Sequence, residues 1–183
     1  MREKEKMING ELYNPQDLEL ASERKYAKII CHQYNNISPE NFEDRKILIT
    51  KFFYKTGKNF VIEPNIFCDY GYNIEIGEKF YSNHNLVILD SAKVKFGDNV
   101  LIGPNCGFYT VEHPLNVSIR NSGLEFAKPI NVGNNVWFGG NVTVLGGVTI
   151  GDNCVIGAGS VVIKDVDQNC VVAGNPAKII KRI

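Results

Sequence analysis

The sequence predicts a mainly β protein, a parallel β-helix of short strands with a helical region at its N-terminal end. An apolar residue recurs every six positions through most of residues 60–170, and the positions between are rich in Gly, Asn and Asp, which favour tight turns. The first 58 residues lack this period and show the three-to-four spacing of helices instead.

Residues 1–58 are predicted to form a helical cap. Apolar residues at a spacing of three to four among Glu, Arg and Lys predict an amphipathic helix over residues 17–34. A second helix is expected to follow, because Ser38 is a good N-cap, Pro39 suits the first helical position and Gly57 is a stop signal.

Residues 59–183 are predicted to form the β-helix. Six consecutive units begin at Val132, Phe138, Val144, Ile150, Ile156 and Val162. Upstream units begin at Ile76, Ser82, Ile88, Phe96 and Ile102, with two-residue insertions before Ile76 and before Phe96. Three units make one triangular coil with apolar side chains inside, so each coil contacts only its neighbours. An ordinary β-sandwich is disfavoured, because sandwich strands recur about every 8–12 residues.

Composition and charge narrow the functional classes. Twenty Lys and Arg balance 20 Asp and Glu, so the chain lacks the positive net charge that favours binding to nucleic acid or to an anionic membrane. The charged N-terminal residues resemble neither a signal peptide nor a spanning helix, and we expect a cytoplasmic protein. The five cysteines are far apart and form no CxxC pair, which predicts reduced thiols rather than disulfides or a zinc site. Three of them fall at inward positions of the repeat: Cys68, Cys106 and Cys154.

One segment interrupts the repeat. Residues 111–129 contain no six-residue unit, although the repeat is regular on both sides. A long excursion from a regular scaffold usually carries function, so this loop is the first place to look for catalytic residues.

Several motifs occur together in one order: KMINGELY, CDYGYNI, the loop with Glu112-His113-Pro114, GNNVWFGG, GVTIGDN, VIGAGS and GNPAK. With the hexads, they resemble the hexapeptide-repeat O-acetyltransferases, and among these the maltose and galactoside acetyltransferases. The resemblance spans nearly the whole chain. It implies a left-handed winding of the β-helix, a homotrimer, and acetyl transfer from acetyl-CoA to a sugar hydroxyl without a metal ion.

The resemblance assigns the chemistry to two residues. His113 matches the catalytic histidine of the family, and a neutral imidazole can take the proton of a sugar hydroxyl as it attacks a thioester. Asn83 matches the active-site asparagine, whose amide can contact both substrates. The structural alternatives are a loop histidine bonded to the backbone and an asparagine at a turn. His32 and His84 are expected to have no catalytic role.

The acceptor contacts implied by the resemblance are carboxylates and a hydroxyl. Asp69 matches the aspartate of maltose-like relatives, and a carboxylate suits vicinal sugar hydroxyls. Asp17 follows the NGELY motif at the maltose-like spacing, with a helix N-cap as the alternative role. Ser91 stands at the family's second acidic contact, beside Asp90.

The coenzyme A groove needs small residues beside the pantetheine arm and cations for the phosphates. The resemblance assigns this groove, in addition to Asn83, to Trp137, Gly140, Ala158, Ile163, Lys164, Lys178 and Lys181. The repeat itself also favours small residues at turns, and an exposed tryptophan could instead be buried between subunits.

Other functional classes stay open on the residues alone. A non-catalytic trimeric scaffold is one, since a fold does not prove an activity. A γ-carbonic-anhydrase-like metal enzyme is less favoured, because the chain has only three histidines without a paired spacing. No sequence feature separates maltose, glucose and galactosides as the acceptor.

Overall fold

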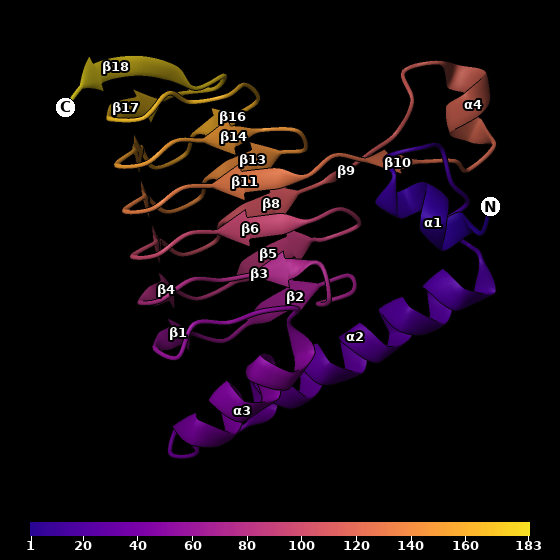
Figure 1. Ribbon diagram of the computed structural model, residues 1–183, viewed down its shortest axis with the longest axis horizontal. Helices are drawn as coiled ribbons and strands as arrows, with labels where there is room; N and C mark the ends of the chain where they lie inside the picture. The colour runs from indigo at the N-terminus through magenta and orange to yellow at the C-terminus, as the bar shows by residue number, and fades with distance from the viewer.

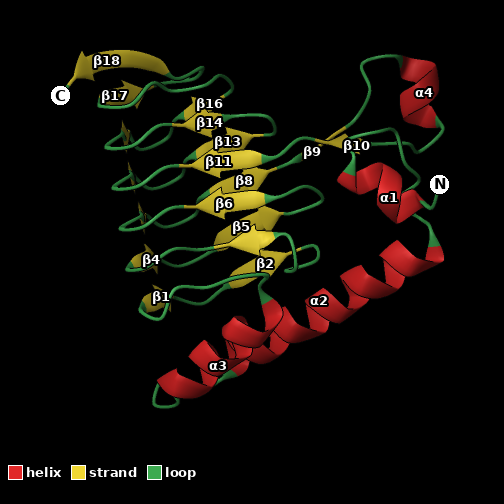
Figure 2. Cartoon of the chain, in the orientation of Figure 1, coloured by secondary structure: helices red, strands yellow, loops and turns green.

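The computed structural model describes residues 1–183 and shows a triangular solenoid with helices across its N-terminal end (Figure 1). Helices α2 (Leu18–Asn36) and α3 (Phe42–Phe52) lie under the first coil. An arm projects sideways from the middle of the solenoid, toward the short helix α1 (Glu3–Ile8). Figure 2 shows that regular helix is confined to the cap and the tip of this arm. No helix has the length and apolar character needed to cross a membrane.

The solenoid has three sheets, one on each side of the triangle. The seven-stranded sheet contains β1 (Phe60–Ile62), β4 (Phe80–Ser82), β7 (Leu101–Ile102), β12 (Trp137–Phe138), β15 (Val155–Ile156), β17 (Cys170–Ala173) and β18 (Lys178–Arg182). The five-stranded sheet contains β2 (Ile66–Cys68), β5 (Leu86–Leu89), β8 (Gly107–Tyr109), β13 (Thr143–Leu145) and β16 (Val161–Val162). The four-stranded sheet contains β3 (Ile74–Glu75), β6 (Val94–Phe96), β11 (Ile130–Val132) and β14 (Thr149–Ile150).

The strand register confirms the parallel β-helix expected from the hexads. Trp137 pairs in parallel with Val155, eighteen residues later, which is one coil of three hexads. Tyr81 pairs with Leu101, twenty residues later, so the two-residue insertions lengthen the early coils. Within these three sheets only β18 is antiparallel: it folds back on β17 and closes the C-terminal end of the seven-stranded sheet.

The interior is filled by the inward side chains of all three sheets. The rings of Phe80, Phe96, Phe108 and Phe138 form an edge-to-face stack with centroids 4.9–5.3 Å apart. The cysteines predicted to point inward are all buried. Asparagines in the left-handed conformation make several corners, and their side-chain amides bond from coil to coil, as between Asn135 and Asn153 at 2.9 Å. This ladder satisfies polar groups that the corners would otherwise leave unpaired.

The second helix of the cap differs from the sequence prediction at both ends. Helix α3 begins at Phe42 after Asn41, not at Pro39, because residues 38–41 form a turn closed by the Asn41 N–H on the Ser38 carbonyl at 2.9 Å. It ends at Phe52, ahead of the predicted stop at Gly57. Lys55 already pairs with Glu75, so the intervening residues belong to the solenoid.

Candidate active site

The arm carries His113 away from the coils. It leaves the corner between the five-stranded and four-stranded sheets on β9 (Val111–Glu112), forms the short helix α4 (Val117–Asn121), and returns on β10 (Phe126–Ala127). His113 follows β9 directly. Its side chain is exposed and makes no hydrogen bond within the chain, whereas Pro114 beside it is buried. The Arg120 guanidinium holds this backbone by donating to the Pro114 carbonyl at 3.1 Å. The imidazole is therefore available to a substrate on a fixed backbone.

The N-terminal segment fastens the base of the arm. The N–H of Tyr13 donates to the carbonyl of Glu125 at 2.9 Å, and the N–H of Glu125 donates back at 3.1 Å. The Tyr13 hydroxyl also donates to the Glu125 carboxylate. Tyr13 is completely buried, so this contact fixes the arm against the cap. No pattern in the sequence predicts this pairing of residues 112 positions apart.

Asp69 lies at the same corner of the triangle as the base of the arm. Its backbone is held by Asp90, whose carboxylate accepts from the N–H groups of Asp69 and Tyr70 at 2.9 Å and of Gly71 at 2.8 Å. Burial raises the pKa of the Asp69 carboxyl, against the opposing effect of the Arg24 guanidinium. Burial also raises the pKa of Asp90 to about 7, although the backbone donors favour its carboxylate. Asp90 is thus a support for this turn.

Arg24 was missed by the sequence analysis and belongs to this corner. It projects from α2, and its guanidinium donates to the Tyr70 hydroxyl at 2.7 Å. The only signal available was an arginine within the amphipathic pattern of the helix, where a solvated side chain is the ordinary interpretation.

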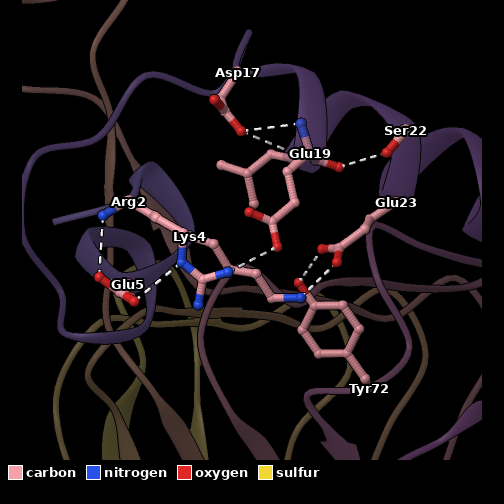
Figure 3. A network of polar contacts seen from close by, with 9 residues as sticks. Arg2, Lys4, Glu5, Asp17, Glu19, Ser22, Glu23 and Tyr72 are labelled. Carbon is pink, nitrogen blue, oxygen red and sulfur yellow. Dashed lines mark hydrogen bonds and ion pairs between the residues drawn. The ribbon is translucent and has the colours of Figure 1, made fainter.

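The other two candidates for acceptor contacts, Asp17 and Ser91, have different surroundings in the structure. Asp17 is the N-cap of α2: one carboxylate oxygen accepts from the N–H of Glu19 at 3.0 Å and of Leu20 at 3.4 Å (Figure 3). Asp17 therefore caps α2 through one oxygen, and its second oxygen makes no hydrogen bond within the chain. Ser91 is buried beside Tyr13, with 2% of its surface exposed, so it presents no hydroxyl to solvent.

Asn83 lies at a different corner, between the seven-stranded and five-stranded sheets, immediately after β4. Its side-chain oxygen accepts from the N–H of His84 at 2.7 Å, and its side-chain amide donates to no group of the chain. The arm of His113 starts from another corner of the triangle, so Asn83 and His113 of one chain belong to different corners.

The candidate coenzyme A residues also lie at several different places on the solenoid. Gly140 and Ala158 share the Asn83 corner in successive coils, where Gly159 N–H donates to the Gly140 carbonyl at 2.9 Å. Trp137 is 54% exposed on the outer face of β12. Two further groups lie elsewhere, Ile163 and Lys164 after β16 at the corner of the arm, and Lys178 and Lys181 on β18.

These positions fit a ligand with a long arm and anionic groups. A side chain at Gly159 would meet no atom within 4 Å, so the corner beside Ala158 is open. Lys164 and the two lysines of β18 are exposed, and none forms an ion pair within the chain. Open backbone and unpaired cations are what a phosphate-bearing thioester needs. No group of three or more metal-ligating side chains occurs in the chain.

Two models of known protein families match the chain. The first is "Maltose acetyltransferase hexapeptide capping motif", over residues 6–57, and the second is "Bacterial transferase hexapeptide (six repeats)", over residues 129–164. Among curated proteins, a putative acetyltransferase of Saccharomyces cerevisiae is 51% identical over 98% of this chain and 92% of its own length. The galactoside O-acetyltransferase of Escherichia coli is 42% identical, with the same two coverages of 98% and 92%.

Solved structures of related proteins superpose on the full length of this chain. A maltose O-acetyltransferase from Clostridium difficile 630 superposes with a TM-score of 0.99 at 46% identity, covering 100% of this chain and 98% of that one. A galactoside acetyltransferase in complex with coenzyme A superposes with a TM-score of 0.96 at 42% identity, covering 100% and 92%. With this identity over its whole length, the chain belongs to the maltose and galactoside O-acetyltransferase family of hexapeptide-repeat acyltransferases.

Proposed function

We propose that this protein transfers the acetyl group of acetyl-CoA to a sugar hydroxyl, in an active site formed between two copies of a homotrimer. The placement of His113 and Asn83 at different corners of the solenoid supports this proposal most directly. A second copy can bring its Asn83 corner to the arm of the first, and three such contacts close a ring.

His113 acts as the general base in this reaction. Its imidazole takes the proton of the sugar hydroxyl while the sugar oxygen attacks the thioester carbonyl. A C–O bond forms, the C–S bond breaks, and the proton leaves with the thiol of CoA. Asn83 holds both substrates, because its unpaired amide can donate to a carbonyl oxygen while its oxygen accepts from a hydroxyl. The transfer is direct, without an acyl-enzyme.

Acetyl-CoA occupies the groove between copies in this proposal. Gly140 and Ala158 leave room for the pantetheine arm, and Trp137 covers the thioester end. The exposed cations Lys164, Lys178 and Lys181 are the partners for its phosphates. The solved galactoside acetyltransferase is a complex with coenzyme A, which supports the assignment of this co-substrate. The buried, reduced cysteines fit a cytoplasmic enzyme.

The acceptor is a polyhydroxyl compound of the maltose, glucose or galactoside type. Asp69 and Arg24 place an acceptor and a donor of hydrogen bonds near the base of the arm, which suits vicinal hydroxyls. A screen of sugars for thiol release from acetyl-CoA tests this proposal. No turnover with any sugar would leave a non-catalytic scaffold as the better interpretation.

The role of His113 is tested by His113→Ala. We expect kcat to fall roughly 10²–10⁴-fold, while CoA affinity, measured by calorimetry, stays nearly unchanged. Intact turnover with lost CoA binding would instead make His113 a cofactor contact.

The location of the site between copies is tested by mixing two inactive variants. His113→Ala and Asn83→Ala chains, co-expressed and purified together through different tags, should form trimers with one intact site. Each mixed trimer then has one intact site of its three, so roughly a third of the wild-type activity should return. If both residues worked within one chain, mixing would restore nothing.

A further inference from the structure

Cys31 and Cys68 meet beneath the cap, although they are 37 residues apart in sequence. Cys31 projects from α2 and Cys68 ends β2, and their sulfur atoms lie 3.7 Å apart. The other three cysteines contact backbone carbonyls instead, as Cys106 does at the Gly139 carbonyl at 3.2 Å. This is therefore the one place in the chain where two thiols face each other.

The thiol pair lines a pocket of about 530 Å³ between α2 and the five-stranded sheet. Each cysteine is almost fully buried, with 4% of Cys31 and 6% of Cys68 exposed, so large reagents are excluded. The same pocket is lined by Lys28, His32 and Asp69. Small polar solutes can enter a pocket of this size and reach the sulfur atoms.

The two thiols are not equivalent. The contact with the Cys68 thiol lowers the pKa of Cys31, although burial, Asp90 and Asp69 oppose this effect. The same contact, together with burial, raises the pKa of Cys68. Because the thiolate is the nucleophile, Cys31 is the attacking sulfur and Cys68 the resolving one.

We propose that Cys31 and Cys68 form a reversible disulfide when a peroxide enters this pocket, and that the bond ties α2 to the solenoid beside Asp69. Cys31 thiolate attacks the peroxide oxygen, giving a sulfenic acid and releasing hydroxide, which becomes water. Cys68 then attacks the Cys31 sulfur, the S–S bond forms and the second water leaves. Two thiols are oxidised and one peroxide is reduced to two waters.

The geometry requires only a small movement. The sulfur atoms must approach from 3.7 Å to about 2.05 Å, which side-chain rotation with a slight shift of α2 can supply. Cys68 directly precedes Asp69, whose N–H is held by the Asp90 carboxylate. Forming the disulfide therefore pulls on the end of β2 that positions Asp69. The expected effect of this movement on sugar binding rests on the proposed function.

The disulfide is tested by treating the reduced, full-length protein with a small excess of hydrogen peroxide. We expect loss of two of the five thiols, a mass decrease of about 2 Da, and one linked pair of peptides containing Cys31 and Cys68. Dithiothreitol should reverse all three changes. Absence of the linked pair, or direct oxidation of Cys31 to sulfinic acid, would overturn the proposal.

The order of attack is tested with single variants. In Cys68→Ser the sulfenic acid on Cys31 cannot be resolved, so dimedone should label Cys31. In Cys31→Ser, dimedone should leave Cys68 unlabelled, and equal labelling there would contradict the assigned roles. Cys170→Ser is the matched control, a buried cysteine outside the pair, and should keep the disulfide.

Two further measurements separate this proposal from the proposed function. The bond closes a loop of 37 residues, so Tm should rise by roughly 5–10 °C on oxidation and fall back on reduction. In the sugar assay, oxidation should raise KM for the sugar several-fold with CoA affinity unchanged. If no sugar is acetylated, the peptide map and Tm still decide whether the disulfide forms, and an unchanged Tm with no linked peptides rejects it.

Discussion

Tyr13 and Glu125 join the helical cap to the arm of His113 by three hydrogen bonds, two between backbones and one from the tyrosine hydroxyl to the carboxylate. Tyr13 precedes α2, and Glu125 lies in the arm that carries His113. The position of His113 therefore depends on the cap as well as on the coils. A reaction that needs an imidazole at a fixed place is sensitive to this contact, even though neither residue is assigned to the chemistry.

Tyr13→Phe should loosen the arm without emptying the core. Loss of one buried hydrogen bond is expected to cost about 1 kcal/mol of unfolding free energy. Amide exchange over residues 111–128 should become faster, and kcat should fall while CoA affinity holds. Tyr26→Phe is the control, since the Tyr26 hydroxyl is exposed and makes no hydrogen bond. Unchanged exchange in the arm would show that the backbone bridge alone holds it.

Asn83→Ala should raise KM for the sugar and also lower kcat, because its amide is proposed to hold both substrates. Folding should be unaffected, since Asn83 is not among the corner residues with positive φ. Asn131→Ala, an exposed asparagine of β11 without a side-chain hydrogen bond, is the control. Steady-state kinetics with both substrates varied decide the matter. An Asn83 variant with normal kinetics would be a turn residue only.

Gly97→Ala should destabilise the solenoid far more than Gly123→Ala. A Cβ at Gly97 would lie 2.5 Å from the Asn134 side-chain oxygen and 2.7 Å from the Gly133 carbonyl of the next coil, so the coils must separate. We expect a cost of about 3 kcal/mol. Gly123 has φ of +83° and no neighbour within 4 Å, so its alanine variant loses only about 1 kcal/mol. Urea unfolding of both variants measures the difference, and equal costs would contradict the close stacking.

The stability of the fold should decrease as pH rises between about 4 and 7, through Asp90. Its pKa is raised by burial from 3.8 to about 7, so in this window the folded chain keeps a proton that the unfolded chain has lost. The slope is expected to reach up to about 1.4 kcal/mol per pH unit. Denaturant unfolding across this pH range should show the slope in the wild type and lose it in Asp90→Asn. Asp44→Asn, at an exposed position in α3, is the control, and a slope retained in Asp90→Asn would assign the proton to another group.

The coils could be predicted from the sequence because their cause is local. A hexad places an inward side chain at a fixed interval, and Asn or Gly supplies each corner, so the period appears in the chain itself. The pairing of Trp137 with Val155 follows directly from this count. The start of α3 could not be predicted in the same way. Ser38 and Pro39 suit a helix start, but they equally suit the turn that they form.

The candidate site was predictable only as a set of residues. Motif order points to His113 and Asn83, yet their separation depends on which corner each one occupies in three dimensions. In the sequence Asp90 is only a neighbour of Ser91, because nothing local predicts that its carboxylate accepts from three N–H groups of another coil. Contacts of this kind join residues far apart in sequence, and a period in the sequence carries no information about them.

The reversed strand β18 determines how long the solenoid can be. Every parallel coil presents, on its open side, a row of backbone groups ready to accept another coil, so such a stack has no natural length of its own. β18 turns back on β17 and runs antiparallel to it, with Arg182 paired to Asp167 at 3.2 Å. A further parallel coil would therefore meet a strand that runs in the opposite direction. The ten residues after β17 thus keep neighbouring molecules from continuing the stack, and a chain without them would present the bare edge of β17 as a template for fibre growth.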